Sequence, residues 1–215
     1  MQKIILFFFV LMNFAASAQK GKSHIGVIIT ATGDTLKGSY HCKKNPGPKD
    51  SLYIHLVGKE EDVAYAWSGL KYFGIPGDDD HVVCPVKRNL EYIDPYSFNI
   101  MLKDSVITQT IPLTAVYTGS HFSLYKFYGP SDYFFISDGV NVIQLVQTYR
   151  YLTNHEQMFY GSRVPRYFIN YVYRSQLLAF YDFDADQKMY NLLENTEYKE
   201  YQLKNLISKM DKKFR

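Results

Sequence analysis

The chain of 215 residues lacks the features of several specialised protein classes. Its 2 cysteines are too few for a disulfide-stapled fold, and its 8 prolines and 13 glycines exclude a collagen-like chain. The glycine-rich loops that bind phosphate groups are absent, as is the G-x-S-x-G turn of a hydrolase nucleophile. The whole chain contains 47% hydrophobic and 21% charged residues, a composition that is typical of a globular protein.

The chain also has little excess of charge. It carries 24 Lys and Arg against 21 Asp and Glu, and removing the leader described below, which holds Lys3, leaves 23 against 21. A net charge of +2 argues against a nucleic-acid partner, because such proteins gather a basic excess on one face. The local exception is a C-terminal cluster, which we interpret as a solvated helix face or, alternatively, as a contact with phosphate groups or a membrane surface: Lys204, Lys209, Lys212, Lys213 and Arg215.

Only one long hydrophobic run is present, at the N-terminus. A positive start ending at Lys3 precedes an apolar stretch over 4–12, and Ala16 and Ala18 stand three residues and one residue before an expected cleavage point. The run is shorter than the ~20 residues of a membrane-spanning helix. We therefore predict a signal peptide over 1–18, cleavage between Ala18 and Gln19, and one globular domain over 19–215. The mature protein is expected in the periplasm or outside the cell, soluble or associated with the outer membrane as a peripheral protein.

Both cysteines, Cys42 and Cys84, belong to the exported part. In an oxidising compartment two thiols commonly pair. A disulfide between them would stabilise the fold by about 4 kcal/mol on the chain-entropy model. The alternative is two separate buried thiols, because the sequence does not tell how near their Cα atoms lie.

Most of the chain predicts β-strands. Residues 25–42 alternate apolar and polar positions around Thr32-Gly33-Asp34-Thr35, which predicts a hairpin, and Asp138-Gly139 predicts a second, two-residue turn. Pro85 cannot donate to a ladder, so the segment around it is expected to be a short edge strand. The other predicted strands are 51–57, 63–75 with a break at Ser68-Gly69, 82–86, 98–103 paired with 105–111, 114–118, 122–128, 133–137 and 140–146.

Helical spacing appears after residue 165. We predict helices over 167–180, 186–194 and 197–213, the last with an apolar stripe, acidic residues at its start and lysines at its end, as the helix dipole favours. The fold class is therefore α+β: an antiparallel sheet over 24–148, as a sandwich or partly open barrel, followed by C-terminal helices over 165–214.

The stretch Gly26-Val27-Ile28-Ile29-Thr30-Ala31-Thr32-Gly33-Asp34-Thr35-Leu36-Lys37-Gly38 resembles the start of a group of exported proteins from Bacteroidetes bacteria. In that group a signal peptide precedes a strand, a Gly-Asp-Thr turn and a second strand. The stretch Phe122-Ser123-Leu124-Tyr125, the hairpin 133–145 and the helical close are similar to its later part. The resemblance implies an origin and a layout for most of the mature chain. It assigns no functional residue.

Two features remain as candidates for chemistry. Asp182, Asp184 and Asp186 alternate like the start of a calcium loop, but Gln187 and Leu193 stand where an EF-hand needs glycine and glutamate. The three carboxylates are therefore candidates for a looser calcium or magnesium site, and otherwise form an acidic loop between helices. The 20 tyrosines all lie in the mature chain and are expected either to pack helices onto the sheet or to line a groove for glycans or peptides.

No motif for a catalytic group or an organic cofactor is found. The expected function is therefore that of an exported, non-enzymatic binding or structural module of the cell envelope, whose partner is an envelope protein or a glycan. One alternative is a hydrolase of envelope or extracellular polymers, whose paired carboxylates would come from distant strands. The other is a small outer-membrane β-barrel, although Tyr133-Phe134-Phe135-Ile136 is apolar on both faces and the chain closes with an amphipathic helix.

Overall fold

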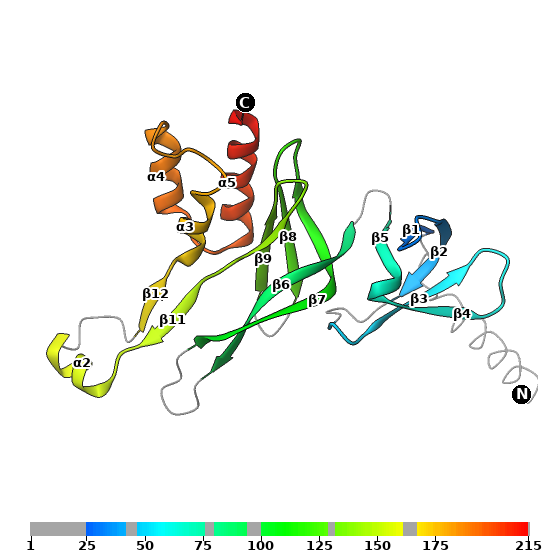
Figure 1. Cartoon of the computed structure of the whole chain (residues 1–215), viewed down its shortest axis with the longest axis horizontal. Coiled ribbons are helices and arrows are strands. Elements are labelled where there is room, and N and C mark those ends of the chain that lie inside the picture. The colour runs from blue at the N-terminus through cyan, green and yellow to red at the C-terminus, as the bar shows by residue number, and fades with distance from the viewer. Residues whose placement is uncertain are drawn as a thin grey trace, which may run out of the picture.

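The computed structural model describes residues 25–41, 47–75, 80–93, 100–128, 132–160 and 167–214. Within them one mixed sheet extends along the molecule, and helices cover one of its faces near one end (Figure 1). The predicted α+β class is confirmed. The strands are β1 (Gly26–Thr30), β2 (Thr35–His41), β3 (Ser51–Leu56), β4 (Asp62–Ala66), β5 (Leu70–Gly74), β6 (His81–Ile93), β7 (Ile100–Thr118), β8 (Ser123–Tyr128), β9 (Asp132–Ser137), β10 (Val142–Leu145), β11 (Thr148–Tyr151) and β12 (Tyr167–Asn170).

The N-terminal strands form as the sequence predicts. β1 and β2 make the expected hairpin, with Gly26 opposite Gly38, and Gly33 supplies the positive φ of 98° that its turn requires. β3 and β4 follow, and a 3-10 turn at Trp67–Gly69 produces the predicted break before β5. Their shared core is small: Ile28, Leu52, Ile54, Trp67, Leu70, Phe73 and Val83.

The predictions around Pro85 and Lys103 are wrong. β6 is a 13-residue strand inside the sheet, paired with β7 along one side. On its other side β6 pairs, within the described residues, with β5 at His81 and Val82 and with β10 at Lys87. Pro85 lies between these pairings, where its missing N–H interrupts no ladder. β7 is one strand of 19 residues, which joins the segments predicted separately as 98–103, from residue 100 on, 105–111 and 114–118. Residues 98 and 99 lie outside the described residues.

The turn signal at Lys103-Asp104-Ser105 marks an irregularity within β7. Asn89 faces Val106 and Glu91 faces Leu102, so β7 has two more residues than β6 between these pairs. Such an insertion bends a strand and locally raises its twist. The polar residues at this irregularity are of the types that also form hairpin turns, so the sequence predicted a turn where β7 continues.

Five strands, β6 to β10, close into a ring. Each pairs with the next in antiparallel fashion, and β10 returns to pair with β6. Because successive strands of a meander alternate in direction, the first and fifth point the same way, and the closing pair must be parallel. We call this β6–β10 contact the seam. It consists of a single registered pair, Ile143 with Lys87.

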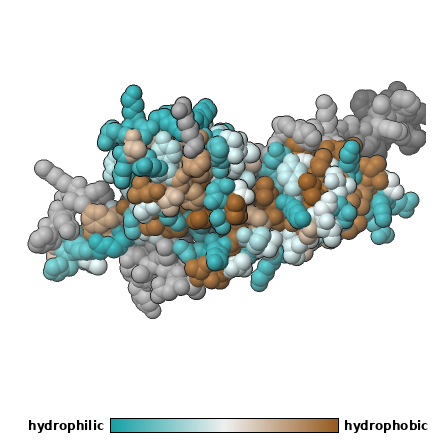
Figure 2. Space-filling model, turned by 45° about the horizontal axis from the view of Figure 1, so that its top comes forward, coloured by the Kyte–Doolittle hydropathy of each residue, from teal (hydrophilic) through white to brown (hydrophobic). Residues whose placement is uncertain are grey.

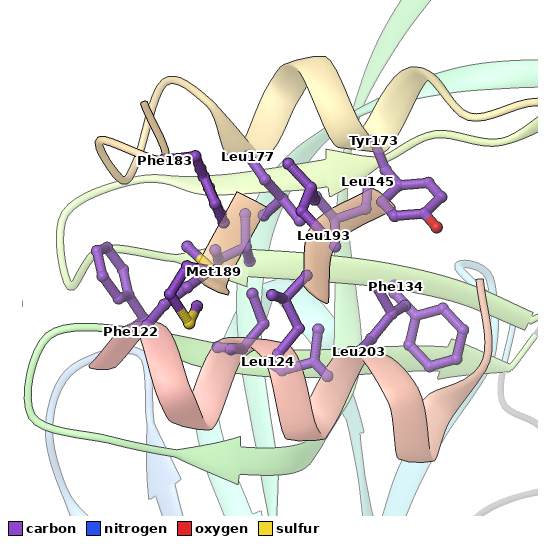
Figure 3. Packing of buried hydrophobic residues seen from close by; sticks show 14 residues of the cluster. Phe122, Leu124, Phe134, Leu145, Tyr173, Leu177, Phe183, Met189, Leu193 and Leu203 are labelled. Atoms are coloured by element: carbon purple, nitrogen blue, oxygen red, sulfur yellow. The ribbon is translucent and has the colours of Figure 1, made fainter. Parts of the chain in front are cut away.

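The ring has two apolar faces, which explains why Tyr133-Phe134-Phe135-Ile136 is apolar throughout. Tyr133 and Phe135 point into the ring, where every strand contributes to one core; Phe134 and Ile136 point outward, under the helices (Figure 3). The interior core consists of Val86, Ile111, Leu113, Phe127, Tyr133 and Phe135, with Cys84, Tyr125 and Val142 packed against it. The core beneath the helices is larger and includes Phe122, Leu124, Leu145, Tyr173, Leu177, Phe183, Met189, Leu193, Leu203, Leu206, Ile207 and Met210.

The predicted helix over 167–180 is only partly correct. Residues 167–170 form β12, which pairs with β11, and only α3 (Val172–Leu177) is helical. β12 is mostly exposed to solvent. Its aromatic residues, Tyr167 and Phe168, are common in strands, so their presence did not distinguish a strand from a helix. Between the two strands lies α2 (Asn154–Tyr160), begun by a capping box in which Thr153 and Glu156 exchange backbone hydrogen bonds.

The two C-terminal helices are confirmed. They are α4 (Gln187–Asn195) and α5 (Glu200–Lys213), and the predicted stripe of Leu203, Leu206, Ile207 and Met210 is fully buried against the ring. Phe214, at the end of the stripe, is 41% exposed. Within the described part of the chain, none of the helices combines the length and the apolar character needed to cross a membrane.

Candidate binding groove at the seam

The three candidate metal ligands, Asp182, Asp184 and Asp186, differ in their contacts in the loop before α4. Asp186 is the N-cap of that helix: its Oδ1 accepts a hydrogen bond from the Met189 N–H, and its Oδ2 lies 2.5 Å from the Lys213 ammonium. These contacts lower the pKa of Asp186, the Lys213 contact being the largest cause. Asp182 accepts from the Ala185 N–H, and Asp184 is exposed. No group of three His, Cys, Asp or Glu side chains in the described ranges is placed to hold a metal ion.

The other predicted positions are only partly within the described residues. Cys84 lies in β6 against the interior core of the ring, and burial raises the pKa of its thiol. Cys42 lies outside the described residues, so the disulfide stays a prediction. Ala18 and Gln19, at the expected cleavage point, lie outside them as well.

One buried carboxylate was missed by the sequence analysis. Asp211, in the last turn of α5, is 7% exposed and accepts hydrogen bonds from the N–H groups of Ser120, His121 and Phe122 at 3.2, 2.6 and 2.8 Å. Burial alone would raise its pKa, but these amides and the Tyr117 hydroxyl lower it to about 2. Its hydrogen-bonding capacity is committed to holding the β7–β8 loop against α5, which is a structural role.

Two of the tyrosines, Tyr173 and Tyr198, pack helices onto the sheet, whereas others, such as Tyr53 and Tyr201, are exposed. The Tyr198 hydroxyl donates to the Leu145 carbonyl at 2.6 Å and accepts from the Phe134 N–H at 3.1 Å. The fully buried Tyr173 donates to the Thr196 carbonyl. These hydroxyls therefore form hydrogen bonds with backbone groups that are buried where the helices pack on the sheet.

A hollow lined by both polar and apolar side chains lies at the seam. It has a volume of about 550 Å³. From β6 it takes Pro85, Lys87 and Asn89, which alternate along the strand and therefore point to the same side. We call it the seam groove; its remaining lining residues are Val106, Val140, Asn141, Val142, Ile143, Gln144 and Gln176.

Side-chain amides replace the backbone ladder where the two strands of the seam separate. Gln144 Oε1 accepts from the Asn89 N–H at 2.9 Å. Gln176, in α3, accepts from the Val146 N–H and donates to the Gln144 carbonyl, both at 2.9 Å, as a neighbouring strand would. Gln144 thus joins β10 to β6 through its side chain, and Gln176 joins β10 to α3.

One donor in this arrangement has no partner. Gln144 is 4% exposed, and its Nε2 makes no hydrogen bond to any described residue. Its Oε1 is fixed by Asn89, so the amide is held in one orientation. A buried donor without an acceptor costs about 1–3 kcal/mol. Gln144 is also one of the residues that line the seam groove.

No sequence signal identified this groove, because a glutamine in a short strand carries no motif. Comparison of the chain with models of protein families, with curated proteins and with solved structures gives no match.

Proposed function

We propose that the chain is an exported, non-enzymatic binding module of the cell envelope, and that the seam groove holds an extended peptide segment of a partner protein. The single observation that supports this most is the unpartnered, buried Nε2 of Gln144 at an open groove. The expected signal peptide and the resemblance to exported Bacteroidetes proteins support the compartment, periplasmic or extracellular.

The lining of the groove favours a peptide over a glycan. Its walls are aliphatic and its polar groups are mainly amides, and in the described part of the chain no aromatic residue lines it. Sugar rings are commonly bound against flat aromatic faces, whereas main-chain carbonyls and N–H groups pair with amides. The outward side chains of β6 repeat every ~6.6 Å, which is also the repeat of an extended peptide.

The hydrolase alternative gains no support from this site. Glycoside hydrolysis needs two carboxyl groups in one cleft. Among the described residues, those that line the seam groove include neither Asp nor Glu. The buried Asp211 is committed to backbone amides elsewhere.

The test is selection of extended peptides from a displayed random library on the mature protein, followed by affinity measurement of a synthetic winner by fluorescence anisotropy. The informative variant is Gln144→Glu, assayed at about pH 9 because burial raises the pKa of a carboxyl group at this position. It keeps an acceptor for the Asn89 N–H and removes the free donor. We expect roughly tenfold weaker binding or more, because an oxygen would face the peptide carbonyl.

The matched control is Gln109→Glu. Gln109 is a half-buried glutamine of β7 that does not line the seam groove. It adds the same charge and should leave the affinity unchanged. Equal binding by the Gln144 variant, or selection that yields no peptide while a glycan array binds, would show that the groove is not a peptide site.

A further inference from the structure

A second groove lies between α4 and α5, and neither helix contributes a residue to the seam groove. The start of α4 lies beside the end of α5, as the 2.5 Å contact between Asp186 Oδ2 and Lys213 Nζ shows. The groove has a volume of about 600 Å³ and a mostly apolar floor that includes Met189 and Leu192.

Lysines surround this floor. Lys188 from α4 and Lys209, Lys212 and Lys213 from α5 line the groove, together with Asn191 and Asn195. The α4 positions recur at intervals of three and four residues, as do those of α5, so each helix presents one face. The sequence showed the cluster on α5 alone; the packing of the helices adds Lys188 and the apolar floor. Figure 2 shows a largely hydrophilic surface over this helical end of the molecule.

Three of these cations are uncommitted. Lys213 is paired with Asp186, whereas no ion pair within the described part of the chain involves Lys188, Lys209 or Lys212. The lining of the groove contains no acidic residue. The mature chain is nearly neutral, so this concentration of positive charge is a local feature and not the result of a basic composition.

We propose that this lysine-rimmed groove docks the protein on a membrane surface that contains anionic phospholipid. Such a surface presents negative headgroups directly above an apolar layer, which matches cations around an apolar floor. The lining cations are all lysines. Lysine acts as a mobile point charge, which suits a fluid layer of headgroups, whereas arginine would favour the fixed bidentate pairing of one protein carboxylate. Lysine stems can also lie along the apolar surface while their ammonium groups stay in water.

The test measures sedimentation of the mature protein with vesicles of phosphatidylglycerol and phosphatidylethanolamine, and with vesicles of phosphatidylcholine alone. We expect binding to the first only, weakening as salt is added. The variant Lys188→Gln/Lys209→Gln/Lys212→Gln should lower the partition coefficient roughly hundredfold, since each lysine near an anionic surface contributes about fivefold. Lys213 is left in place because it supports the cap of α4.

The matched control removes three exposed lysines from the N-terminal strands and turn, as Lys37→Gln/Lys59→Gln/Lys71→Gln. It makes the same change in net charge and should retain binding within about twofold. Thermal melting of all three proteins establishes that each is folded. Equal losses in the two variants, no binding of the unaltered protein to anionic vesicles, or preferential binding to a polyglutamate peptide would overturn the proposal.

Discussion

Asp211 allows the sharpest test of how the helices are held on the ring. The perturbation is Asp211→Asn, which keeps the shape of the side chain but replaces one acceptor oxygen by an NH₂ group. That group would face the Ser120 N–H or the N–H groups of His121 and Phe122, all of which are donors. No rotation of the amide restores an acceptor to both sides. The adjacent loop lies directly against the carboxyl group, since a Cβ on Gly119 would be 2.4 Å from the Asp211 Cγ.

The magnitude follows from the pKa of the carboxyl group. Folding lowers the pKa of Asp211 from 3.8 to about 2. Each unit corresponds to about 1.4 kcal/mol, so the ionised carboxylate contributes about 2 kcal/mol to the free energy of unfolding. Because the folded pKa is the lower one, this contribution is complete above pH 3.8 and is lost as the pH falls to about 2. We expect Asp211→Asn to destabilise the protein by about 2–3 kcal/mol at neutral pH.

The assay is urea unfolding of the two proteins between neutral pH and about pH 2, followed by circular dichroism. The difference in stability should shrink as the pH falls, because the unaltered carboxyl group then also becomes protonated. Asp184→Asn, at an exposed carboxylate, is the control and should change stability by less than about 0.5 kcal/mol. A difference that stays constant down to the lowest pH, or no difference at neutral pH, would refute the assignment of Asp211 as an ionised anchor.

Two further contacts give measurable expectations. Tyr198→Phe removes the hydroxyl that bonds to a carbonyl of β10 and an N–H of β9. It should lower the free energy of unfolding, measured with urea, by about 1–3 kcal/mol. The same change at the exposed Tyr190 is the control and should have little effect. The pKa of Glu156, measured by NMR titration, should be about 2, with the Thr153 N–H as its largest cause and Arg150 as the second. Arg150→Met should therefore raise this pKa only part of the way, and complete recovery of the ordinary value would contradict the dominance of the backbone hydrogen bond.

The elements that the sequence predicted correctly are those with a complete local pattern. The first hairpin combines alternating strands with a glycine at the required positive φ, and α5 combines an apolar stripe with charges placed for its dipole. The errors arose where one local signal fits two structures. Lys103-Asp104-Ser105 is typical of a turn and also of an irregular strand, and the aromatics at 167–170 fit a helix face or an exposed ribbon.

The sequence by itself determined the α+β class, the strand-rich first part and the two closing helices, because each rests on the periodicity of neighbouring residues. Only the tertiary structure decided that β6 to β10 close into a ring and that the Gln144 side chain bridges its seam. It also decided that Asp211 is buried against a loop some ninety residues earlier, and that Lys188 joins the lysines of α5 around an apolar floor. These arrangements depend on contacts between residues far apart in the chain, and such contacts are set by how the strands close and the helices pack and not by any spacing along the sequence.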